Sequence, residues 1–130
     1  MTVSKSIVLL SICALVGGCL PSISTSFSIV ERADPLSDVP ALEKLCKDLG
    51  LKREDAVGPP QPAKGTFVCT SQPGRGYFIV FTPAPDKREV EVYFAEVAHD
   101  FSAEARSAYS SLVRKLQEQY GDSAGRAPAI

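Results

Sequence analysis

The sequence has little of the chemistry that metal sites require. His99 is its only histidine, and four cysteines are spread over 130 residues. A zinc site needs three or four nitrogen, sulfur or oxygen ligands at close spacing, and the chain offers no such group. We therefore expect no metal and no other cofactor bound within the fold.

Blocks of like charge are also absent from the sequence. The chain has 14 basic and 15 acidic residues and a formal net charge of −1, and no basic stretch alternates with aromatic residues. Domains that bind nucleic acid usually gather lysine and arginine on one face. The composition therefore gives no support to a nucleic-acid partner.

The main apolar run, residues 7–16, is too short to remain in a membrane as a span. A helix of about ten residues rises about 15 Å, half of the ~30 Å hydrocarbon core. Lys5 precedes the run, as in the positively charged start of a secretory signal. The N-terminus therefore predicts export, and no second apolar segment of spanning length follows it.

The apolar run ends in Val16-Gly17-Gly18-Cys19. Small residues let a peptidase approach the backbone, and a thiol at the next position can carry a diacylglycerol as a thioether. This motif resembles the lipobox of bacterial lipoproteins. The resemblance implies that residues 1–18 are a signal peptide and that Cys19 carries diacylglycerol and an acyl chain, which anchor the protein permanently. The alternative is an ordinary secreted protein with an unmodified Cys19.

Leu20, rather than aspartate, follows the candidate lipid site. In proteobacterial lipoproteins this difference directs the protein to the outer membrane. The resemblance therefore implies a lipid-anchored protein on the periplasmic face of the outer membrane.

The remaining cysteines predict one disulfide. Cys13 would leave with the signal peptide, and Cys46 and Cys69 would stay in an oxidising compartment, where cysteines usually pair. In the chain-entropy model such a bridge contributes about 3 kcal/mol of stability. Two free, buried thiols are the alternative.

Residues 19–36 are rich in serine and contain Pro21, which predicts a tether between the lipid and the domain. Within this segment, Phe27, Ile29 and Val30 leave open a short edge strand. Residues 37–121 form a single domain, and residues 122–130, which show no apolar pattern, are predicted to be a frayed tail.

The domain itself alternates between helical and strand patterns. Helical spacing of apolar residues and capping signals (Ser37 or Asp38, and Ser102) predict helices over residues 39–49 and 103–120. Strands are expected over residues 66–71, 77–82 and 88–97, with a proline-rich loop over 51–64. The fold class is therefore α+β, with a three-stranded antiparallel meander and both helices on one face, in the order α-β-β-β-α. Cys69 faces the helices and can meet Cys46.

The sequence carries no convincing catalytic group. His99, Asp100 and Ser102 have the residue types of a hydrolase triad, but residues so close in sequence point in different directions. Glu89 and Glu91 alternate with valines and are typical of a solvated strand face. We therefore expect a protein that is not an enzyme.

Two tyrosines are the candidate partner surface. Tyr77 and Tyr93 lie in adjacent predicted strands, and on the open sheet face their amphipathic rings would suit a protein partner. The leading hypothesis is a non-catalytic interaction protein or accessory subunit of the cell envelope. The alternative is a periplasmic inhibitor or immunity protein that blocks an enzyme.

Overall fold

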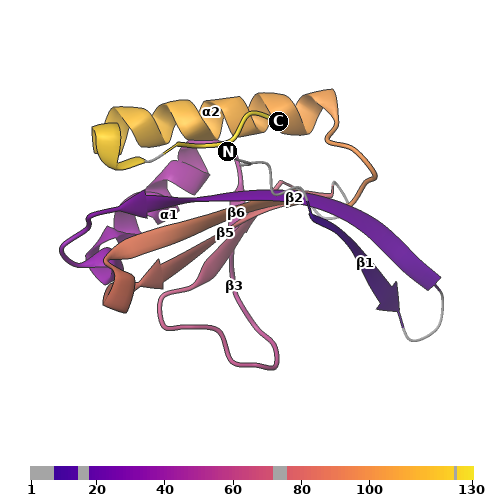
Figure 1. The fold of residues 1–130 in the computed structure, drawn as a ribbon, viewed down its shortest axis with the longest axis horizontal. Coiled ribbons are helices and arrows are strands. Elements are labelled where there is room, and N and C mark those ends of the chain that lie inside the picture. The colour runs from indigo at the N-terminus through magenta and orange to yellow at the C-terminus, as the bar shows by residue number, and fades with distance from the viewer. Residues whose placement is uncertain (1–7, 15–17, 72–75, 125) are drawn as a thin grey trace.

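The computed structural model describes residues 8–14, 18–71, 76–124 and 126–130. These form an α+β fold with two α-helices above an antiparallel sheet, as the sequence predicts (Figure 1). The helices are α1 (Val39–Asp48) and α2 (Ala103–Tyr120), and the short 3-10 turns are η1 (Pro35–Asp38), η2 (Pro85–Lys87) and η3 (Gly121–Ala124).

Five strands form the body of the sheet, in the order β2-β6-β5-β4-β3, and β1 pairs with the outer part of β2. The predicted meander is β4-β5-β6, but the prediction of three strands was wrong. The strands are β1 (Val8–Ala14), β2 (Gly18–Val30), β3 (Lys52–Asp55), β4 (Phe67–Thr70), β5 (Tyr77–Ala84) and β6 (Glu89–Glu96).

The prediction of a tether over residues 19–36 was wrong, because most of this segment is β2. From Ile23 to Val30 the strand pairs antiparallel with β6. Ile29 is only 1% exposed and belongs to the core. Residues 22–29 alternate strictly between serines and larger residues, which is the period of a strand with one buried face. Serine-rich composition is typical of a tether, but the alternation in this segment indicates a strand.

The predicted loop over residues 51–64 contains one further strand. β3 pairs with β4, with Lys52 opposite Thr70 and Asp55 opposite Phe67, and all four of its residues are exposed. A short, fully charged strand at a sheet edge has no buried face and therefore no hydrophobic pattern to reveal it. Its charges discourage pairing with another chain.

Both helices cover the same face of the sheet (Figure 1). In the pairing register, Cys69, Ile79 and Phe94 lie opposite one another and share this face. The Phe94 ring lies 5.2 Å from the ring of Tyr109 in α2. On the α1 side, Cys46 forms the predicted disulfide with Cys69, with their Cα atoms 6.1 Å apart. The core therefore lies between the sheet and the two helices.

The prediction of a frayed tail over residues 122–130 was also wrong. The chain turns back through η3, and Ala124 is 3% exposed. The Tyr109 hydroxyl donates a hydrogen bond of 2.7 Å to the Pro128 carbonyl, and Ala127 and Ile130 pack against the core. Small side chains can fill space beside a helix without any periodic pattern, so no local pattern predicts this packing.

Candidate functional site

The sheet face opposite the helices carries a half-buried apolar row. Val68 of β4, Val80 of β5 and Tyr93 of β6 lie directly opposite one another in the register, and Ser26 of β2 extends the row. Because facing residues of an antiparallel pair point to the same side, these side chains form one continuous surface. We call this surface the open face.

Phe78 widens the apolar part of the open face. Its ring lies 6.3 Å from the ring of Tyr93, tilted by 45°. Phe78, Val80, Val68 and Tyr93 are all partly exposed. Large side chains that stay partly exposed together on a sheet are the kind of surface that protein partners contact.

Carboxylates lie on two sides of the apolar centre, at the start of β6 and on the edge strand β3. Glu89 accepts a hydrogen bond of 3.1 Å from Ser28, and Glu54 accepts one of 2.9 Å from the Thr70 hydroxyl. These contacts hold the acidic groups at the margin of the open face. Glu91, the third carboxylate, lies 3.7 Å from the Lys87 ammonium group. The open face therefore has an apolar centre and a charged margin, in which the three carboxylates lie beside Lys87 and the exposed Lys52 of β3.

The two predicted partner-surface tyrosines lie on opposite faces of the sheet. Tyr93 is on the open face as expected. Tyr77 is on the helix side, where its ring lies 5.9 Å from that of Phe94 and it packs against the core. The two tyrosines therefore do not form one site.

Sequence reasoning missed Phe78 and Val80. The run from Tyr77 to Phe81 is apolar on both faces, so alternation could not decide which residues point outward. The signal lies in the turn η2, which sets the register and places Val80 opposite Tyr93.

His99, Asp100 and Ser102, which have the residue types of a hydrolase triad, do not form a catalytic group in the structure. Ser102 is the N-cap residue before α2, and its hydroxyl accepts a hydrogen bond of 3.0 Å from the Ala105 amide. The same hydroxyl donates to the Glu96 carboxylate at 2.7 Å, and the Ser102 amide donates to that carboxylate at 2.7 Å. His99 and Asp100 are exposed on the turn before α2. Ser102 is therefore a helix cap, as predicted.

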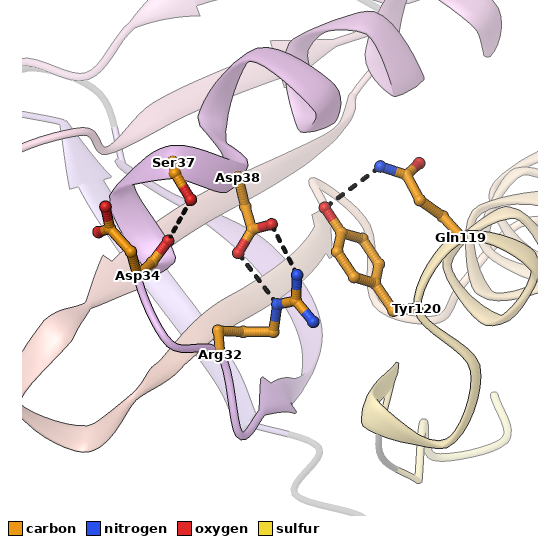
Figure 2. A network of polar contacts seen from close by, with 6 residues as sticks. All are labelled: Arg32, Asp34, Ser37, Asp38, Gln119 and Tyr120. Atoms are coloured by element: carbon orange, nitrogen blue, oxygen red, sulfur yellow. Dashed lines mark hydrogen bonds and ion pairs between the residues drawn. The ribbon is translucent and has the colours of Figure 1, made fainter.

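A partly buried ion pair links the segment after β2 to the start of α1 (Figure 2). Arg32 donates two hydrogen bonds of 3.1 Å to Asp38, which is 8% exposed, and its guanidinium lies 4.8 Å from the centre of the Tyr120 ring. The hydrogen bond to Asp38 raises the pKa of Arg32. Burial and the nearby Asp38 carboxylate raise the pKa of Tyr120 to about 12.

The sequence suggested that Ser37 or Asp38 caps α1, and neither side chain does so. Asp38 instead binds Arg32, and the Ser37 hydroxyl donates to the Asp34 carbonyl at 2.7 Å. Both carboxylate oxygens of Asp38 accept hydrogen bonds from the Arg32 guanidinium. The pair therefore holds the segment after β2 against the start of α1. We assign it a structural role.

The predicted lipid site, Cys19, lies in β2, four residues before the pairing with β6 begins at Ile23. Of the predicted signal peptide, residues 1–7 and 15–17 lie outside the described part of the chain. β1 lies wholly within that signal peptide, so its removal would leave the five-stranded body of the sheet.

Among the described residues, no three histidine, cysteine or acidic side chains gather closely enough to hold a metal ion. No helix within the same ranges is long and apolar enough to cross a bilayer. Comparisons with protein-family models, with curated proteins and with solved structures found no match.

Proposed function

We propose that this chain is a lipid-anchored protein of the bacterial cell envelope that binds another protein through the open face without catalysing a reaction. The observation that carries the proposal is the apolar row of Val68, Val80 and Tyr93, widened by Phe78. The helices cover one face of the sheet, and this row lies on the other. The lipobox-like motif at Cys19 supports the anchor.

The open face also favours a particular chemistry in the partner. Aromatic and aliphatic side chains at its centre suit a partner with an apolar core to its binding surface. The carboxylates of Glu54 and Glu89 at the margin favour lysine or arginine beside that core, and Glu91 is already paired with Lys87. Complementary charges of this kind mainly set specificity and the rate of encounter.

Crosslinking in living cells tests this proposal. A photoreactive amino acid at position 93 is expected to form one prominent adduct with an envelope protein, identified by mass spectrometry. The matched control places the same amino acid at Val57, which is 86% exposed in the loop between β3 and β4. The substitution Tyr93→Lys should abolish stoichiometric co-purification of that partner, and Val57→Lys should leave it unchanged.

The outcomes also separate an accessory subunit from an inhibitor. A resident envelope complex that crosslinks at position 93 makes the protein an accessory subunit. Crosslinking only when an incoming enzyme is supplied, with loss of that enzyme's activity, makes it an inhibitor or immunity protein. Equal labelling from positions 93 and 57 would contradict the assignment of the open face.

A further inference from the structure

The folded domain begins very close to the candidate lipid site. Ile23 is 6% exposed, belongs to the core and pairs with Glu96. Cys19 lies only four residues earlier. Because an extended residue spans at most about 3.6 Å, the link from Cys19 to Ile23 reaches about 14 Å at most. This is roughly the hydrocarbon thickness of a single leaflet.

Strand direction decides which end of the sheet lies near the lipid. β2 runs antiparallel to β6, so Ile23 lies at the end where β6 finishes and β5 begins. Figure 1 shows β2 running past the sheet at this end, on the side where α2 starts. Residues 97–100 follow β6 here, and we call them the anchor end. The Val97 amide donates to the Gly76 carbonyl at 2.7 Å, which fixes the start of this segment on the sheet.

We propose that the anchor end lies against the headgroup region of the membrane that holds the Cys19 lipid. The inference rests on the proposed lipid anchor and adds an orientation to it. A link of four residues leaves no room for the domain to move far from the bilayer. Val97, which is 40% exposed, can place its apolar side chain at the boundary of the acyl chains.

The opposite end of the sheet is held away from the membrane. Val30 closes the pairing of β2 with β6, seven residues beyond Ile23. At about 3.4 Å per residue, this end lies about 24 Å further along the strand. Val30 is 36% exposed, so it matches Val97 in type and exposure but lies at the far end. The open face, which spans the two ends, then remains accessible to a partner from the side.

The chain has no tryptophan, which allows a direct test. The variants Val97→Trp and Val30→Trp each carry a single tryptophan at one end of the sheet. Each is produced as the full precursor, purified with its lipid and reconstituted into phosphatidylcholine vesicles with and without brominated acyl chains, which quench tryptophan on contact. We expect loss of fluorescence from Val97→Trp and no loss from Val30→Trp. A ten-residue Gly-Ser insertion after Ser22 should remove the quenching of Val97→Trp.

Mass spectrometry of the same samples tests the lipid anchor at Cys19 separately from the orientation of the domain. A lipid on Cys19 with equal quenching at both positions overturns the orientation and leaves the anchor intact. Quenching that survives the insertion also overturns the inference, because the short link would then not be its cause. An unmodified Cys19 overturns the anchor and the orientation together.

Discussion

Tyr109 shows at the residue scale how burial governs a side chain in this core. Its ring contacts Phe94 and Phe27, and its hydroxyl reaches the Pro128 carbonyl. Burial raises the pKa of Tyr109 to about 12, against a partial lowering by a hydrogen bond with Thr25. The tyrosine is therefore held in its neutral form well above the pH at which a free tyrosine ionises.

The direction of this shift predicts the behaviour of the protein in alkali. The folded state binds the Tyr109 proton more tightly than the unfolded state, so the stabilisation is complete below pH 10 and is lost as the pH rises towards 12. The free energy of unfolding, measured by urea titration, should fall across this range. Tyr109→Phe should flatten the fall and remove a late step from the absorbance titration of tyrosinate. Ionisation of Tyr109 with a midpoint near pH 10 while the fold stays intact would contradict this.

At the scale of elements, β2 decides whether residues 19–36 are linker or domain. Ile29→Ala should lower the free energy of unfolding by about 2–4 kcal/mol, because it opens a cavity in a closed core. Ser26→Ala, on the exposed side of the same strand, should change it by less than about 0.5 kcal/mol. Urea unfolding of the two variants beside the parent measures both effects. Equal, negligible effects would mean that β2 does not pack in solution.

The elements also show what the sequence could and could not reveal. α2 was predicted with its observed bounds because it has a cap at Ser102, a long apolar stripe and a glycine at its end. β3 could not be found because all its residues are exposed. The open face was anticipated through Tyr93, but Tyr77 was placed on the wrong side because β5 is apolar on both faces. Local patterns therefore indicated the helices, and the strand faces required the register between strands.

At the scale of the whole molecule, the two helices are attached to the sheet in different ways. α2 packs over β6 through Tyr109 and Phe94, and its cap residue Ser102 donates a hydrogen bond to Glu96 of β6. α1 has ten residues, and an isolated helix of that length is marginal in water. The Cys46–Cys69 disulfide attaches α1 covalently to β4 and so complements the burial of Leu42 and Leu45.

The disulfide should therefore matter for the whole domain and most strongly for α1. In the chain-entropy model, closing the loop between Cys46 and Cys69 contributes about 3 kcal/mol. We expect the double variant Cys46→Ala/Cys69→Ala to lose stability of that order in urea unfolding. Hydrogen exchange should show α1 amides losing protection before those of α2, because α1 then depends on side-chain burial alone. Equal loss of amide protection in both helices would contradict this order. If reduction leaves the urea unfolding of the parent protein unchanged, the disulfide does not contribute to its stability.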